Sequence, residues 1–175
     1  MSEPSSATWS VQEAPGLPWP LQAGMTGDLP DINVWLAMAV QEHPHHTWAR
    51  NYWSSAVAQT PAMPGPKLWF CRTTMLGLVR LLCQPKVVGT GALELPAAWN
   101  LYLRFRAMAQ IGLLADPAGC ETQLAALLSS TQPPTRLWTD TYLAALSQSS
   151  GLRLVTFDKD FARFGLANCL ILDRS

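Results

Sequence analysis

Residues 152–158 read LRLVTFD, a mostly apolar run from Leu152 to Phe157 that is directly followed by Asp158. A short run of this kind predicts a buried β-strand. Similar apolar runs predict further strands at residues 68–71, 111–114 and 169–172. The strand at residues 152–157 is the best defined of the four, and it places Asp158 at its carboxyl end.

The segments between these strands carry apolar residues at helical spacing. Helices are predicted at residues 31–40, 45–58, 99–109, 121–128 and 135–147, and one more begins at a Thr73 or Thr74 cap and stops before Pro85. Strands that alternate with helices predict an α/β fold with three layers (α/β/α), in which helices cover both faces of a central parallel sheet. In such folds ligands bind beyond the carboxyl ends of the strands, where Asp158 is expected.

Asp31 and Asp140 share with Asp158 a position at the border of an apolar stretch, in a chain with only 12 acidic residues among 175. A carboxylate in apolar surroundings loses hydration worth several kcal/mol unless it gains a proton, a partner or a cation. Mg²⁺ and Mn²⁺ prefer carboxylate and water oxygens. The three aspartates together favour a divalent-metal site, whereas any one of them alone fits a helix cap or a turn equally well.

Composition narrows the class of protein. Apolar residues make up 49% of the 175 residues, enough for one sizeable core, and the formal net charge is zero. Because no global basic field attracts nucleic acid, an RNA partner would be held by local charges or by a metal ion.

The four cysteines lack C-x-x-C spacing and predict reduced thiols of a cytoplasmic protein. We expect no membrane association, since neither a signal-peptide pattern nor an apolar run of roughly 18 residues is present.

Two regions are expected along the chain. Residues 1–27 are rich in Pro and Ser, with Trp9 and Trp19 as large apolar anchors. This composition predicts a flexible N-terminal tail that either stays disordered or docks onto the body or a partner. Residues 28–175 contain every predicted strand and helix and form the expected domain.

Five segments of the chain resemble the PIN domain, in particular the VapC-type toxins of bacterial toxin–antitoxin pairs. They are residues 31–37 (DINVWLA), residues 43–46 (HPHH) with Ala49 and Trp53, residues 72–82 (RTTMLGLVRLL), residues 138–145 (WTDTYLAA) and residues 155–161 (VTFDKDF). Each segment alone is weakly specific, but five in the right order are specific. The resemblance covers nearly all of residues 28–175.

The resemblance implies a PIN-like ribonuclease domain that is the toxin component of a type II toxin–antitoxin system. Its implied activity is that of a metal-dependent endoribonuclease, which hydrolyses RNA phosphodiester bonds with Mg²⁺ or Mn²⁺. Asp31, Asp140 and Asp158 would be the catalytic acids and metal ligands. Asn33 and Thr156 flank these acids and would hydrogen-bond to them or to a water on the metal ion. The implied partners are RNA, a cognate antitoxin protein and a second copy that forms a homodimer.

The chain departs from the family pattern at Gly77, where many members carry a Glu that binds metal. The loss of one of four charges motivates an alternative function, a catalytically impaired PIN-like module that binds RNA or protein. A branch of VapC-like proteins shares the Gly-x-x-Arg pattern, so the departure is also compatible with activity. Asp160 or Glu42 could supply the missing metal ligand, and Asp160 fits the cap of a helix that begins near Phe161 equally well.

A haloacid-dehalogenase-like phosphatase is the last-ranked alternative. That family also begins with an Asp after a strand, but it needs a second Asp two residues later, where this chain has Asn33. The sequence therefore favours a nuclease or a binding module over this kind of phosphatase.

Four basic residues have both functional and structural interpretations. Arg80 has three interpretations. It contacts an RNA phosphate as a substrate-binding residue, it forms an ion pair with one of the active-site carboxylates, or it forms a structural ion pair. His43, His45 and His46 have no zinc-spaced ligand nearby and favour the start of a helix with ordinary polar contacts over a metal cluster.

The eight tryptophans are unusual for this chain length. Trp48 and Trp53 lie on a predicted helix through which members of the resembled family contact a partner. Both fit a protein interface and core packing equally well. Trp138 is expected in the core.

Overall fold

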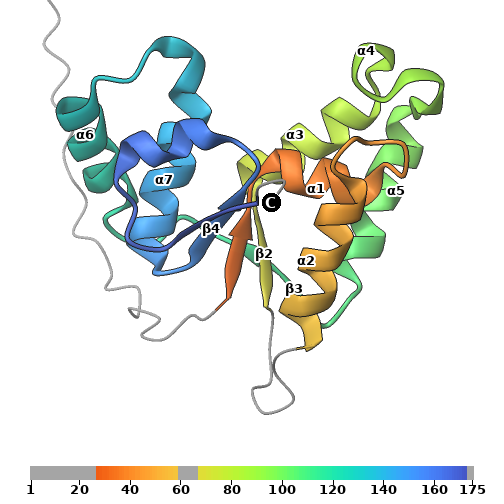
Figure 1. Cartoon of the computed structure of the whole chain (residues 1–175), viewed down its shortest axis with the longest axis horizontal. Coiled ribbons are helices and arrows are strands. Elements are labelled where there is room, and N and C mark those ends of the chain that lie inside the picture. Colours follow the sequence, from red (N-terminus) through yellow and green to blue (C-terminus); the bar gives the residue numbers. More distant parts are fainter. Residues whose placement is uncertain (1–26, 59–66, 173–175) are drawn as a thin grey trace, which may run out of the picture.

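Five parallel strands form one sheet in the order β3-β2-β1-β4-β5 (Figure 1). The computed structural model describes residues 27–58 and 67–172. The predicted tail at residues 1–27 lies outside the described residues except for Gly27. The parallel sheet is confirmed, and four strands fall on the predicted runs. The strands are β1 (Asp28–Pro30), β2 (Leu68–Cys71), β3 (Ile111–Leu114), β4 (Arg153–Thr156) and β5 (Cys169–Ile171).

The sequence pattern does not predict the central strand, β1. This strand has three residues and ends in Pro30, and a proline normally argues against a central strand because it cannot donate a ladder hydrogen bond. β1 nevertheless pairs with β4 along its whole length and with β2 through Asp28. Its neighbours in the sheet define it, and those contacts are distant in the sequence.

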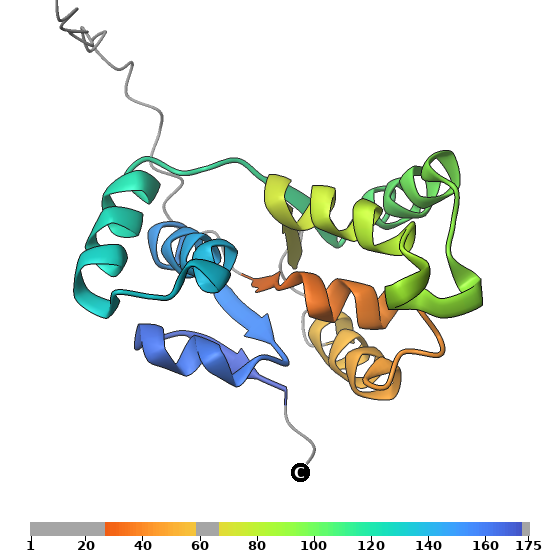
Figure 2. The same ribbon diagram turned by 90° about the horizontal axis from the view of Figure 1, so that it is seen from above.

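Helices cover both faces of the sheet, which confirms the α/β/α prediction (Figure 1, Figure 2). Successive residues of β4 serve the two cores: Val155 packs with the helices of one face and Leu154 with those of the other. One face carries α1 (Ile32–Ala39), α2 (His46–Ala58), α3 (Arg72–Leu82) and α5 (Leu95–Arg106), and the other carries α6 (Cys120–Thr131) and α7 (Trp138–Ser150). The shorter elements are α4 (Pro85–Val88), η1 (Gly89–Gly91), η2 (Thr135–Leu137) and η3 (Lys159–Phe164). Within the described residues, no helix is long and apolar enough to cross a membrane.

The start of α3 differs from the predicted one. Cys71, and not Thr73 or Thr74, occupies the N-cap position, so the helix begins at Arg72. The Thr74 hydroxyl bonds back to this cap, accepting from the Cys71 N–H at 3.0 Å. Thr74 therefore supports the helix start from inside the first turn.

Two other helix starts differ for local reasons. α5 begins at Leu95 and not at residue 99, because Pro96 fits the first turn of a helix. The helix predicted from Thr135 begins as the 3₁₀ turn η2 and becomes α-helical at Trp138. This turn sets the direction from which α7 approaches the sheet.

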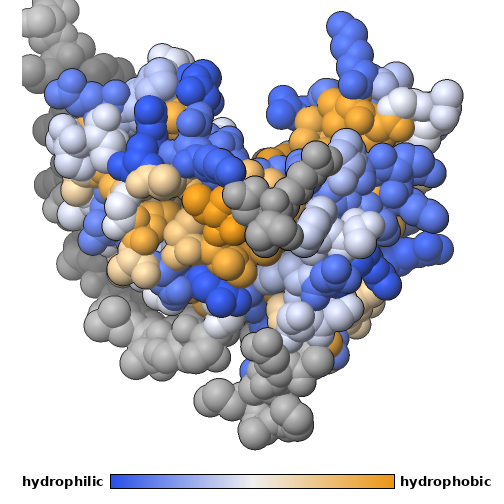
Figure 3. Space-filling view, viewed as in Figure 1, coloured by the Kyte–Doolittle hydropathy of each residue, from blue (hydrophilic) through white to orange (hydrophobic). Residues whose placement is uncertain are grey.

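The direction in which strands are added to the sheet reverses between β1 and β4. The chain fills one side of β1 with β2 and β3 and the other side with β4 and β5. Such a switch point creates a crevice beyond the carboxyl ends of the two strands. The surface is hollowed between the two helical layers at this end of the sheet (Figure 3). Asp31 directly follows β1 and Asp158 stands two residues beyond β4, so both lie at this edge.

Candidate functional site

Asp31 is deeply enclosed, with 4% of its surface exposed. It occupies the N-cap position of α1, where its Oδ1 accepts a hydrogen bond from the Ile32 N–H at 2.6 Å. Its Oδ2 accepts from Asn33 Nδ2 at 2.6 Å and from the Thr156 hydroxyl at 2.9 Å. Both carboxylate oxygens are therefore held by uncharged donors from the first turn of α1 and the end of β4.

Burial raises the pKa of the Asp31 carboxyl to about 7, against the hydrogen bonds from Thr156 and Ile32 that favour the charged form. The negative charges of Asp140 and Asp158 raise this pKa further. Asp31 is consequently close to its titration midpoint near neutral pH. A nearby cation would favour its charged form.

Asn33 and Thr156 link the first turn of α1 to the end of β4, as the sequence suggested for groups that flank the acids. Asn33 Nδ2 also donates to the Thr156 hydroxyl oxygen at 3.0 Å. Asn33 Oδ1 accepts from the Phe157 N–H at 3.2 Å, and the Thr156 hydroxyl oxygen accepts from the Asp158 N–H at 3.0 Å. The segment that carries Asp158 is thus tied to the residues that hold Asp31.

Asp158 occupies the N-cap position of η3, where its Oδ1 accepts from the Asp160 N–H at 2.8 Å. The capping role considered for Asp160 is therefore wrong, because Asp158 has it. Asp160 instead forms an ion pair with Arg136, whose Nη1 lies 2.8 Å from Asp160 Oδ2. A role for Asp160 as a metal ligand stays a prediction, and one of its oxygens is engaged by the arginine.

Asp140 extends from the first turn of α7 and is half-buried. Burial raises the pKa of the Asp140 carboxyl, the charges of Asp158 and Asp160 raise it further, and the Arg136 guanidinium lowers it. The carboxylates of Asp31, Asp140 and Asp158, far apart in the sequence, therefore act on one another at the switch point.

The chemistry of these donors fits a hard divalent cation. Carboxylate oxygens are the ligands that Mg²⁺ and Mn²⁺ prefer. Among residues 27–58 and 67–172, no three His, Cys, Asp or Glu side chains already have the geometry of a metal site. Burial and the charges of neighbouring carboxylates raise the pKa values of Asp31 and Asp140, and a bound cation would offset that repulsion.

Gly77 lies in α3 and faces α1. A Cβ at this position would collide with Cδ1 of Ile32, the residue that follows Asp31. The place at which the resembled family carries a Glu is therefore filled by the end of an isoleucine side chain. This packing explains why glycine is accommodated in the middle of α3 without leaving a cavity there.

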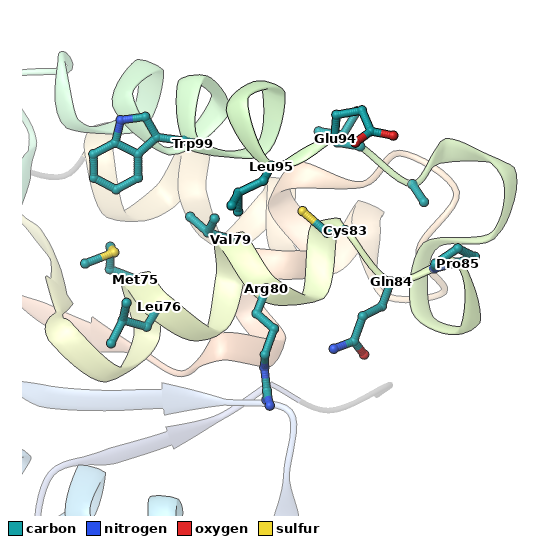
Figure 4. Close-up of a pocket in the computed structure, with 12 residues that line it drawn as sticks. Met75, Leu76, Val79, Arg80, Cys83, Gln84, Pro85, Glu94, Leu95 and Trp99 are labelled. Carbon is teal, nitrogen blue, oxygen red and sulfur yellow. The ribbon is translucent and has the colours of Figure 1, made fainter.

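Arg80 lies on α3 and borders a groove of about 710 Å³ between α3 and α5 (Figure 4). Leu76 and Trp99 also line the groove, and the Arg80 side chain extends away from Trp99. In the described part of the chain, Arg80 forms no ion pair with an acidic side chain. The predicted ion pair of Arg80 with an active-site carboxylate is therefore wrong, and contact with RNA stays a prediction.

His43 and His46 make the ordinary polar contacts expected of a helix start, whereas the buried Nδ1 of His45 has no hydrogen-bond partner among the described residues. His46, the first residue of α2, places Nδ1 2.8 Å from the Ala37 carbonyl, and His43 Nδ1 accepts from the His45 N–H at 3.1 Å. The His45 ring stacks on Phe157 with ring centres 4.5 Å apart. The first turn of α2 is thus fixed to α1 and to the residue before Asp158.

The tryptophans divide between core and surface. Trp53 is half-buried beside Phe105, whereas Trp48 is exposed. The core prediction for Trp138 is wrong, because 54% of its surface is exposed. Leu137 and Thr141 take the inward positions of this turn, which leaves Trp138 outside.

Two charged residues near this end of the sheet were not singled out by the sequence pattern. Asp116 follows β3, and its Oδ1 accepts from the Tyr142 hydroxyl at 2.7 Å. Its position two residues beyond an apolar run was a sequence signal that could have identified it. Arg136 lies in η2, where a short polar turn carries no periodic signal.

Comparisons with known proteins agree on one family. The PIN domain model matches residues 29–166. Ribonuclease VapC41 of Mycobacterium tuberculosis is 37% identical over 139 residues, which cover 77% of this chain and 91% of that protein. The crystal structure of M. tuberculosis VapC20, a sarcin–ricin loop cleaving toxin, is 17% identical and covers 81% of this chain and 98% of its own, with a TM-score of 0.57. A toxin–antitoxin complex from Klebsiella pneumoniae is 14% identical and covers 85% of this chain and 100% of its own, with a TM-score of 0.52.

Proposed function

The chain belongs to the PIN domain family, and on that premise we propose that it is a metal-dependent endoribonuclease, the toxin component of a type II toxin–antitoxin system. One observation carries the proposal: Asp31 stands at the switch point of the sheet, and burial together with the charges of Asp140 and Asp158 raises its pKa to about 7. The identity to ribonuclease VapC41 over most of the length of that protein supports the reaction type.

Asp31, Asp140 and Asp158 are the residues that would hold Mg²⁺ or Mn²⁺. The bound ion would lower the pKa of a coordinated water, polarise the scissile phosphate and offset the negative charge that grows on it. Asp160 is the further ligand suggested by the sequence, and it would have to share its carboxylate with Arg136.

The protein's own residues hold the site in shape. Asn33 and Thr156 fix Oδ2 of Asp31, and the Asp160 N–H fixes Oδ1 of Asp158. Asp140 stands in the first turn of α7, where the helix dipole favours a negative charge. The carboxylates are thus presented on regular elements, which keeps them aligned with a phosphate that enters the crevice.

The proposed partners are RNA, a cognate antitoxin and a second copy of the chain in a homodimer. The shared fold with the toxin–antitoxin complex from K. pneumoniae supports the antitoxin. We further propose that residues 28–175 form the ribonuclease domain, that residues 1–27 form a tail and that the protein acts in the cytoplasm. Sedimentation of the purified chain with and without an antitoxin tests the assembly.

Cleavage of a labelled total RNA pool tests the proposed function. The wild-type protein is incubated with Mg²⁺, with Mn²⁺ or with EDTA, and the ends of the products are mapped. Discrete cuts that require metal are expected. RNA that is bound but uncut by the folded protein at saturating metal would overturn the ribonuclease proposal in favour of a binding module, and Gly77 would then be the residue to examine.

A further inference from the structure

We propose that Arg136 binds a phosphate of the RNA at the candidate site and that Asp160 is the residue that positions it. The inference rests on the ribonuclease function proposed above. In this inference Asp160 orients Arg136 and does not bind metal. The positively charged guanidinium of Arg136 then lies beside the three aspartates.

Arg136 joins the two elements that carry Asp140 and Asp158. It lies in η2, the turn that leads into α7, four residues before Asp140, and its charge acts on the Asp140 carboxylate. Its Nη1 donates to Asp160 Oδ2 at 2.8 Å. Asp160 in turn donates its N–H to Asp158 at 2.8 Å. The guanidinium is therefore anchored at the rim of the acid site by a residue two positions from Asp158.

The anchored guanidinium retains donors for a ligand. An arginine has five N–H donors in a planar fork, and one of them serves the ion pair with Asp160. The Arg136 side chain is 66% exposed, and among the described residues its one hydrogen bond is the bond from Nη1 to Asp160. Arginine presented in this way binds phosphate through two parallel hydrogen bonds. Its charge also acts on the site itself, since it lowers the pKa of Asp140.

The ion pair between Arg153 and Asp28 shows what a structural pair looks like in this protein. Arg153 donates through Nε and Nη2 to both oxygens of Asp28, each at 2.8 Å, and Asp28 is buried at the opposite end of the sheet. Tyr52 completes that arrangement by donating to Asp28 at 2.7 Å. The Arg136–Asp160 pair has one such bond and is open to solvent, and an exposed pair of this kind adds little to stability.

RNA binding by the full chain tests the inference. A fluorescein-labelled, single-stranded 20-nucleotide RNA of mixed sequence is titrated in EDTA, where metal-dependent cleavage cannot occur, over a series of salt concentrations. Arg136→Ala is expected to weaken binding about tenfold. The slope of log K against log salt is expected to fall by about 0.7, the value for one lost phosphate contact to a single strand.

Three further variants separate phosphate contact from a structural role. Arg104→Ala, the matched control, removes an equal charge from an exposed position on α5 and is expected to change binding by about twofold or less. Arg136→Lys keeps the charge and is expected to retain the salt slope while losing part of the affinity. Asp160→Asn frees the guanidinium and is expected to raise KM for cleavage at saturating metal, at an unchanged melting temperature.

Equal RNA affinity and equal salt slope for wild type and Arg136→Ala, with both folded by circular dichroism, would overturn the inference even if the wild type cuts RNA. An RNA-binding wild type that never cuts with metal would overturn the ribonuclease proposal and leave the Arg136 comparison valid. A wild type that binds no RNA would overturn both.

Discussion

The Thr156 hydroxyl donates a hydrogen bond to Asp31 Oδ2 at 2.9 Å and so joins the last residue of β4 to the acid that follows β1. The same hydroxyl oxygen accepts from the Asp158 N–H at 3.0 Å. One small polar side chain at the switch point therefore holds two of the three aspartates. The geometry of the site depends on this group as well as on the acids themselves.

Replacement of Thr156 by valine tests that dependence. Thr156→Val keeps the shape of the side chain but removes the donor to Asp31 and the acceptor for the Asp158 N–H. Groups that orient metal ligands typically contribute about 10- to 100-fold to metal affinity or activity, so the RNA cleavage rate at limiting Mn²⁺ should fall by that amount. Thr156→Ser, which keeps the hydroxyl, is the control. Equal rates for the valine and serine variants would show that the hydroxyl is not needed.

Asp31 should make the protein less stable as the pH rises toward neutrality. Below pH 3.8 the folded and unfolded states both hold the proton, and the group contributes nothing. Between pH 3.8 and about 7 the unfolded chain ionises while buried Asp31 keeps its proton, so the free energy of unfolding falls, by about 4 kcal/mol in total, and then levels off. Asp31→Asn has no such dependence at this position.

Urea unfolding of wild type and Asp31→Asn in EDTA, from pH 4.5 to 8, measures this difference. The stability of the variant relative to wild type should increase with pH up to about 7 and then remain constant. Other titrating groups largely cancel in the difference, since they are common to both proteins. A difference that is the same at every pH would contradict the raised pKa of Asp31.

Divalent metal should raise the melting temperature of the wild type through the three aspartates. A ligand at 100 times its Kd stabilises the folded state by about 2.7 kcal/mol, which is a shift of several degrees for a domain of this size. Asp158→Asn should lose most of the shift on addition of Mn²⁺. Asp116→Asn serves as the control, since Asp116 contacts Tyr142 beyond β3 and should respond like wild type. Equal shifts in all three proteins would place the metal elsewhere.

The packing of Gly77 against Ile32 should appear in a double-mutant cycle. Gly77→Ala adds a Cβ that collides with Ile32 Cδ1, so the gain in helix propensity of about 1 kcal/mol is offset by the displacement of the isoleucine. In an Ile32→Val background the δ-carbon is gone, and Gly77→Ala should stabilise the protein by about that amount. Urea unfolding of the four proteins gives the coupling, and strictly additive effects would contradict the contact.

The sequence pattern was sufficient for the elements whose signal is local. The runs that became β2, β3, β4 and β5 are apolar and bounded by polar or turn residues, and Asp158 marks the end of β4. β1 was not predicted, because three residues that end in Pro30 show no periodicity. Its pairing partners, which are distant in the sequence, define the strand. The predicted helix at residues 99–109 starts four residues late, because α5 begins at Leu95 with Pro96 in its first turn.

For the candidate site, too, the sequence pattern was sufficient only for residues whose signal is local. Asp31, Asn33, Thr156 and Asp158 lie at strand ends or helix starts, where polarity against an apolar run is visible in the sequence. The partner of Asp160 was not visible, since Arg136 is 24 residues away in a turn and the pair depends on how α7 and η3 meet. Trp138 was predicted in the core but is exposed. Helical spacing alone does not decide which residues of a first helical turn face the core.

The most direct test of the ribonuclease site compares wild type, Asp140→Asn and Asp116→Asn for cleavage of an RNA that the wild type cuts, with Mn²⁺ and with EDTA. Both variants remove one negative charge near the carboxyl edge of the sheet, but only Asp140 influences the pKa of Asp31. The account predicts metal-dependent cleavage by wild type and Asp116→Asn and a loss of at least about 100-fold for folded Asp140→Asn. Cleavage by Asp140→Asn at the wild-type rate would contradict it.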